Sequence, residues 1–118
     1  AKDLYKIGGE LVAPKEIEEI IGQHEAINQV YICGVPDERM GEVGAAFVQF
    51  KSGKSSSEEE LTAFVQERLA RFKVPKYWMF VEEFPMTASG KIQKFMLRKI
   101  AIEHFGLGGN ATPSAQRR

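Results

Sequence analysis

The chain has 118 residues, of which 43% are hydrophobic and 27% charged, as in one ordinary globular domain that is small for an enzyme enclosing a nucleotide and a second substrate. Its 16 basic and 16 acidic residues give a formal net charge of zero, so we expect no nucleic-acid partner. There is no apolar run near the roughly 20 residues of a membrane span and no signal-peptide pattern, so we expect no transmembrane segment.

The single cysteine, Cys33, lies in an apolar run, which predicts a buried structural thiol. One cysteine cannot form an intramolecular disulfide, which suits a reducing compartment, and we expect a cytoplasmic protein. The chain lacks an initiator Met and begins in a charged segment, so we also expect it to be a piece of a longer protein.

The N-terminal segment predicts a hairpin followed by a helix. Gly8 and Gly9 allow positive φ angles, so residues 2–10 suit a short hairpin. Pro14 then stands at a first-turn position, ahead of glutamates and isoleucines at helical spacing. This pattern predicts an amphipathic helix that Gly22 ends.

Two apolar runs rich in β-branched residues, 27–35 and 43–50, flank a turn-forming loop at 36–41. They predict two antiparallel neighbouring strands. After a Ser/Gly/Lys linker, Ser57 and Glu60 have the spacing of a capping box, which predicts a helix that ends near Arg71.

The last part of the chain predicts a strand, a loop and a helix. An aromatic strand is expected at 77–81, a loop at 85–91, and a helix at 92–104 that Gly106 terminates. The order β-β-α-β-β-α-β-α predicts an α+β domain: a small, mostly antiparallel sheet with three packed helices, plus a separate N-terminal two-stranded hairpin. We expect three parts in the chain: the glycine hairpin with the residues before it at 1–13, a compact domain at 14–106, and a mobile tail at 107–118.

The loop at 85–91 is the clearest candidate for chemistry. It carries Lys91 behind Gly90, near the hydroxyls of Thr87 and Ser89, and an ammonium on such a loop suits an anionic ligand. It is not a P-loop, because Ile92 stands where that motif needs Ser or Thr. A strand-to-helix turn that ends in a solvated lysine is the alternative.

The usual catalytic patterns are missing. His24 and His104 have no partners at ligand spacing, so we expect no metal site. Asp37, Glu38 and Glu42 could form paired carboxylates, but a solvated turn is favoured. Lysines and glycines instead gather in two segments, 2–10 and 87–94, and neither segment can enclose a ligand alone. A lysine on an open surface gains little, because solvent screens its charge. We therefore expect the chain to act as a lid that closes over an active site in another domain.

Several segments form an ordered set of motifs: Lys2-Asp3, 6–10, 14–18, 34–37 with 41–42, 72–77 and 85–91. In order and approximate spacing, they resemble the C-terminal domain of the AMP-forming acyl-CoA synthetases, and the resemblance runs from Ala1 to about His104. The superfamily also holds adenylation domains of peptide synthetases and firefly luciferase.

The resemblance implies a large N-terminal domain, absent here, that binds ATP, Mg²⁺ and a carboxylic acid, and a small domain that alternates between two poses. Lys91 would be the adenylation lysine, on a loop supported by Thr87, Ser89 and Gly90. In the second pose CoA would enter along the hairpin. The residues implied there are the hinge, Lys2 and Asp3, and the pantetheine-channel residues, Lys6, Gly8, Gly9 and Glu10.

Two departures from the family concern the hairpin and the hinge. Leu11-Val12-Ala13 replaces the Asn and aromatic residue of many relatives, and the family's Arg for the ribose hydroxyls falls before Ala1. The segment from Trp78 to Phe95 is similar to that of synthetases for fatty acids of medium or longer chain.

Two other functions stay open. One is a free-standing module that docks on a partner enzyme or carrier protein, and the other is part of an adenylating enzyme that loads a carrier protein. The spacing from Pro85 to Lys91 also resembles the pattern that bacterial lysine acetyltransferases recognise in such synthetases, which implies acetylation of Lys91.

Overall fold

The computed structural model describes residues 4–108. The elements in chain order are β1 (Tyr5–Ile7), β2 (Glu10–Val12), α1 (Pro14–Ile21), β3 (Ile27–Asp37), β4 (Gly41–Phe50), α2 (Glu58–Gln66), a 3₁₀ turn (Arg71–Lys73), β5 (Tyr77–Phe80) and α3 (Lys94–Phe105). The predicted order of strands and α-helices is confirmed. So is the α+β class, with a five-stranded, mostly antiparallel sheet.

The sheet is built around β4, which pairs with three other strands. β3 runs antiparallel beside it over almost its whole length, and β5 runs parallel beside residues 45–48. β1 meets β4 at Ile7 and Gly41. The prediction of a separate N-terminal hairpin is therefore wrong, because the hairpin extends the main sheet. One paired position is too short to leave a periodic signal in the sequence.

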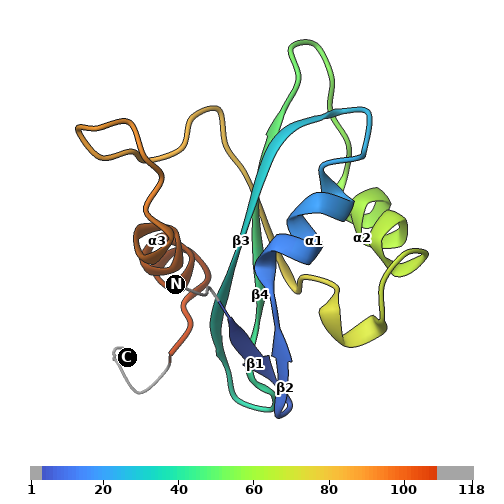
Figure 1. Cartoon of the computed structure of the whole chain (residues 1–118), viewed down its shortest axis with the longest axis vertical. Coiled ribbons are helices and arrows are strands. Elements are labelled where there is room, and N and C mark those ends of the chain that lie inside the picture. Colours follow the sequence, from blue (N-terminus) through green and yellow to red (C-terminus); the bar gives the residue numbers. More distant parts are fainter. Residues whose placement is uncertain (1–3, 109–118) are drawn as a thin grey trace.

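Both faces of the β3–β4 ladder are buried. Because side chains alternate along a strand, Ile32 and Val48 face α1 and α2, while Cys33 and Phe47 face α3. Figure 1 shows α3 on one side of the sheet and the other two helices on the opposite side. Coverage of both faces explains the nearly continuous apolar runs. The buried position of Cys33 confirms the predicted buried thiol.

The central strands reach further into their turn than predicted. Pro36 pairs with Glu42, and Asp37 pairs with Gly41. A proline fits because β3 lies at the edge of the sheet, where alternate residues direct their N–H groups away from β4 and the missing donor leaves the ladder intact.

The helix caps confirm three predicted boundaries, while two other ends differ. Ser57 and Glu60 form the capping box of α2, and Gly22 and Gly106 cap α1 and α3. However, α2 ends at Gln66, and residues 67–70 separate it from the 3₁₀ turn that begins at Arg71.

α3 begins later than predicted, and β5 ends earlier. Met86 and Ile92 form an isolated antiparallel bridge, and the extended Gln93 caps the helix, so α3 starts at Lys94 instead of residue 92. β5 ends at Phe80, one residue before the predicted end.

Two glycines opposite each other in the ladder make room for Tyr5. Gly34 pairs with Gly44, and the Tyr5 ring lies across both. A Cβ atom at Gly34 would be 2.7 Å from Tyr5 Cβ, and one at Gly44 would be 2.7 Å from Tyr5 Oη. The hydroxyl is buried, and none of residues 4–108 hydrogen-bonds with it. The glycine pair thus holds the start of β1 against the sheet.

A double-mutant cycle tests this packing. Gly44→Ala should destabilise the chain by about 1–3 kcal/mol through overpacking. Tyr5→Phe removes a buried hydroxyl that has no partner among the described residues and should be neutral or stabilising by about 1 kcal/mol. The double variant should recover most of the loss, because the clashing oxygen is gone. Urea unfolding of the four proteins measures these terms, and strictly additive effects would contradict the proposed contact.

Candidate functional site

Lys91 lies at the end of a tight loop between β5 and α3. Inside the Met86–Ile92 bridge, the Thr87 N–H donates to the Lys91 carbonyl at 2.9 Å, and the Gly90 N–H donates to the Thr87 carbonyl at 2.9 Å. Gly90 has a φ of 84°, which a glycine adopts without the steric cost of a side chain. The loop is therefore a small closed turn that presents Lys91 at the surface.

The side chain of Lys91 points to solvent and has no partner within the described chain. It is exposed, and the hydrogen bonds and ion pairs of residues 4–108 do not involve its ammonium. The Thr87 and Ser89 hydroxyls lie 2.9 Å apart, and the Thr87 oxygen lies 3.4 Å from the Lys91 backbone nitrogen. The two hydroxyls thus support the shape of the loop and leave the ammonium available to an anion.

The first turn of α3 is fixed to the open edge of β3. The Lys94 ammonium donates to Glu18 at 2.5 Å and to the Ile32 carbonyl at 2.9 Å. The same Glu18 oxygen accepts from the Ile32 N–H at 2.9 Å. Both backbone groups of one edge residue are thereby satisfied by side chains from α1 and α3. Lys94 follows Lys91 by only three residues, so this pair also anchors the candidate loop.

A second polar connection joins α3 to the N-terminal hairpin. The Arg98 guanidinium donates to the Gly34 carbonyl at 2.8 Å and to Glu42 at 3.1 Å. The other Glu42 oxygen accepts from the Lys6 backbone N–H at 3.1 Å. Glu42 therefore links β1, β4 and α3. Sequence reasoning did not find this residue's role, because its partners lie 56 and 36 residues away.

The hairpin turn rests on the turn between β3 and β4. Gly8 and Gly9 have φ angles of 57° and 90°, as the predicted turn requires. The Gly8 N–H donates to the Met40 carbonyl at 2.8 Å, and the Met40 side chain lies against Gly8. Lys6 and Glu10 direct their side chains to solvent. The turn is thus fixed on one side and open on the other.

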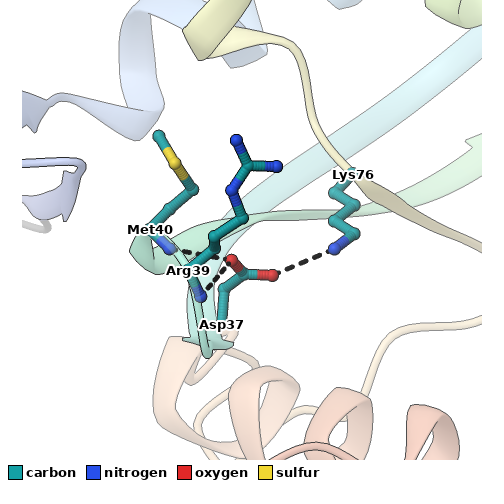
Figure 2. Close-up of polar contacts among 4 residues, drawn as sticks. All are labelled: Asp37, Arg39, Met40 and Lys76. Atoms are coloured by element: carbon teal, nitrogen blue, oxygen red, sulfur yellow. Dashed lines mark hydrogen bonds and ion pairs between the residues drawn. The ribbon is translucent and has the colours of Figure 1, made fainter.

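Asp37 organises the turn between β3 and β4, and Figure 2 shows its contacts. One carboxylate oxygen accepts from the N–H groups of Arg39 and Met40, at 3.1 and 2.9 Å. The other accepts from the Lys76 ammonium at 3.0 Å. The Met40 N–H and Lys76 hold the pKa of Asp37 below its ordinary value, and Asp37 raises the pKa of Lys76.

The three acidic residues of this region do not form a carboxylate pair. Asp37 bonds to Lys76, Glu42 bonds to Arg98, and Glu38 is exposed. The predicted solvated turn is right for Glu38 and wrong for Asp37, whose side chain is only 8% exposed. Asp37 is shielded from solvent by a long-range contact, because Lys76 lies 39 residues further along the chain.

Other predicted residues lie apart from these turns or outside the described range. His24 accepts from the Ala26 N–H, and His104 contacts Phe105. Within residues 4–108, no three His, Cys, Asp or Glu side chains gather as metal ligands would. Lys2 and Asp3, the predicted hinge, lie outside the described residues. None of the helices in this range has the length and apolar character that crossing a membrane requires.

The two candidate segments lie at opposite ends of the molecule. In Figure 1 the loop before α3 is at the upper left, and the β1–β2 and β3–β4 turns are together at the bottom. The view has the longest axis vertical, and that axis extends 40 Å. One small ligand therefore cannot contact both ends at once.

Comparison with known proteins decides the family. The family described as AMP-binding enzyme C-terminal domain matches residues 16–91. This chain belongs to that family. One relative is a Bacillus subtilis protein with the name "Putative acyl-CoA synthetase YngI". The two sequences are 48% identical over 109 residues, a stretch that covers 92% of this chain and 20% of that protein. This chain is 42% identical over 107 residues to the mitochondrial medium-chain acyl-CoA ligase ACSF2 of Rattus norvegicus, covering 91% and 17%.

Solved structures of the family have the same fold. A fatty acyl CoA synthetase of Mycobacterium tuberculosis superimposes with a TM-score of 0.78 at 37% identity, over 86% of this chain and 20% of that one. Apo MatB of Rhodopseudomonas palustris superimposes with a TM-score of 0.83 at 34% identity, over 89% and 21%. The chain thus spans about a fifth of the length of the relatives it matches.

The edge contact of Glu18 should matter for stability. Glu18→Gln removes the negative charge from the contact with the Lys94 ammonium, which is 23% exposed, and should cost about 1–3 kcal/mol. The matched control is Glu67→Gln, which breaks an exposed pair with Arg68 and should cost less than about 0.5 kcal/mol. Chemical denaturation of the 118-residue chain compares the two. Equal losses would show that the edge contact has no special weight.

The pair of Asp37 and Lys76 predicts a pH-dependent stability. Because folding lowers the pKa of Asp37 below its ordinary value of 3.8, the carboxylate stabilises the fold above that pH and loses this contribution as the pH falls through the folded-state pKa. The difference in melting temperature between wild type and Asp37→Ala should therefore be largest near neutral pH and narrow in acid. Glu38→Ala should stay close to wild type throughout, and a gap that does not change with pH would refute the assignment.

Proposed function

We propose that this domain is the mobile lid of an AMP-forming acyl-CoA synthetase, and that Lys91 serves the adenylation step. The observation that carries the proposal is an exposed lysine without a partner in the described chain, at the end of a tight loop that backbone hydrogen bonds close. ATP or AMP, Mg²⁺, the carboxylic acid and CoA would be bound mainly by a large N-terminal domain of the same protein. The lengths of the relatives support this division.

The chemistry explains why a lysine is needed and why it must arrive from a lid. When a carboxylate attacks the α-phosphate of ATP, two anions approach each other, and an ammonium offsets the charge that gathers in the transition state. A lysine on an open surface does this poorly, since solvent screens it. Enclosure between two domains removes that solvent and strengthens the interaction.

The opposite end of the domain suits the second half-reaction. The Gly8–Gly9 turn has no side chains, and a Cβ atom at Gly9 would meet nothing within 4 Å. Such a turn could line a narrow channel for the pantetheine arm of CoA, with Lys6 and Glu10 beside it. Because this turn and Lys91 lie at opposite ends (Figure 1), the domain would rotate about the predicted hinge, Lys2 and Asp3, between the two steps.

Substrate, acceptor and modification are further parts of the proposal. We favour a fatty acid of medium or longer chain, in line with the names of two relatives, and a cytoplasmic enzyme. A carrier protein in place of CoA is the second candidate acceptor, because the same turn could serve either thiol. The exposure of Lys91 also leaves it accessible to a lysine acetyltransferase, which would remove its charge.

The full-length enzyme tests the role of Lys91. A panel of acetate, octanoate, palmitate and benzoate, each with ATP and either CoA or a carrier protein, should identify the acid and the acceptor. Lys91→Ala should then slow adenylation by about 10²–10³-fold, the scale for loss of one preorganised electrostatic donor. It should leave thioester formation from preformed acyl-adenylate nearly unchanged.

The matched control is Lys99→Ala, which removes an exposed lysine of α3. It should leave both steps unaltered, because Lys99 lies outside the candidate loop. Pyrophosphate release and thioester formation are measured separately. If Lys91→Ala adenylates at the wild-type rate, the proposed role is wrong. If the wild-type enzyme forms no acyl-adenylate from any acid, the proposed function is wrong.

A further inference from the structure

The carboxylate of Asp37 is mostly occupied by contacts within the domain. Its side chain is 8% exposed, and it accepts three hydrogen bonds: two from backbone N–H groups of its own turn and one from Lys76. Figure 2 shows these three contacts. Because three of the roughly four acceptor positions of a carboxylate are filled, Asp37 is better suited to hold the groups around it than to bind a substrate directly.

One of the groups that Asp37 holds, the backbone of Met40, contacts the hairpin turn between β1 and β2. Met40 is held at both ends of its backbone: its N–H donates to Asp37 at 2.9 Å, and its carbonyl accepts from the Gly8 N–H at 2.8 Å. The Met40 side chain also lies against Gly8, where an added Cβ would be 2.9 Å from Met40 Cε. The position of Gly8 therefore follows the position of Met40, which follows Asp37.

We propose that Asp37 is the positioning residue for the Gly8–Gly9 turn, acting through Met40. This inference rests on the proposed function, in which the turn lines the path of the thiol acceptor. Lys76 completes the arrangement, because its charge holds the carboxylate in the orientation that serves the two backbone donors. Asp37 thus sets the geometry of the thioester-forming step and has no part in adenylation.

The Gly8–Gly9 turn and the Lys91 loop lie far apart, so a change at Asp37 should affect only the thioester-forming half-reaction. The Lys91 loop lies at the far end of the molecule from this turn (Figure 1), and α3 is held there by Glu18 and Ile32 through Lys94. A displaced Gly8 turn would narrow or misalign the acceptor channel, and a shift of about 1 Å can cost on the order of 10²-fold in rate. The loop that carries Lys91 would stay in place. A residue that only stabilised the fold would instead affect both half-reactions together.

The test uses the full-length enzyme with the best acid of the panel above. Asp37→Ala should slow thioester formation from preformed acyl-adenylate by at least about tenfold, with pyrophosphate release within about twofold of wild type. Glu38→Ala removes an exposed carboxylate from the same turn and should leave both rates unchanged. Asp37→Asn keeps one side-chain oxygen for the backbone donors and should restore most of the thioester rate, to about two- to threefold below wild type.

The pattern of the two rates decides the outcome. Equal slowing of both half-reactions by Asp37→Ala, or no slowing of either, overturns the proposal. If Asp37→Ala does not fold, Asp37→Asn decides the matter, because it should slow only the thioester step, by about two- to threefold; equal or absent effects again overturn it. A wild-type enzyme that makes the acyl-adenylate but no thioester contradicts the proposed acceptor step itself, whatever the variants do.

Discussion

The open edge of β3 is the place on which the arrangement of this domain depends. An edge strand presents N–H and carbonyl groups that need partners, and a protein must cover them or leave them to another chain. Here Glu18 accepts from the Ile32 N–H, while Lys94 and Arg98 donate to the carbonyls of Ile32 and Gly34. The acceptor Glu18 belongs to α1 and both donors belong to α3, on opposite faces of the sheet. One set of contacts therefore closes the edge and also ties α1 to α3.

This arrangement connects the packing of the fold to the geometry of its surfaces. The helix that reaches the edge is the helix that follows the candidate loop, so the start of α3 cannot shift without breaking an ion pair that is mostly shielded from solvent. The hairpin joins the same body through Glu42 and through Tyr5, which lies on the Gly34–Gly44 pair. The described residues are therefore cross-connected from β1 to α3.

Local signals in the sequence predicted what depends on neighbouring residues. The capping box of Ser57 and the glycine that ends α3 have their partners within a few residues, and both were located correctly. What failed depends on contacts far along the chain. The hairpin joins the sheet through a single pair of residues, and Asp37 is removed from solvent by Lys76. Charge and spacing cannot distinguish a solvated acidic turn from one whose partner arrives later, so the carboxylates were assigned the wrong surroundings or no role.

The location of Lys91 follows from the same reasoning. Residues that form ion pairs within this domain serve its structure: Lys94, Arg98 and Lys76 each hold a carboxylate that in turn holds backbone groups. Lys91 stands apart, because its loop is stabilised by backbone hydrogen bonds and its ammonium has no hydrogen bond or ion pair among residues 4–108. An exposed ammonium of this kind adds little to the stability of the isolated fold. Under the proposed function, a second surface supplies the anion, and the exposed position of Lys91 is what such an interface requires.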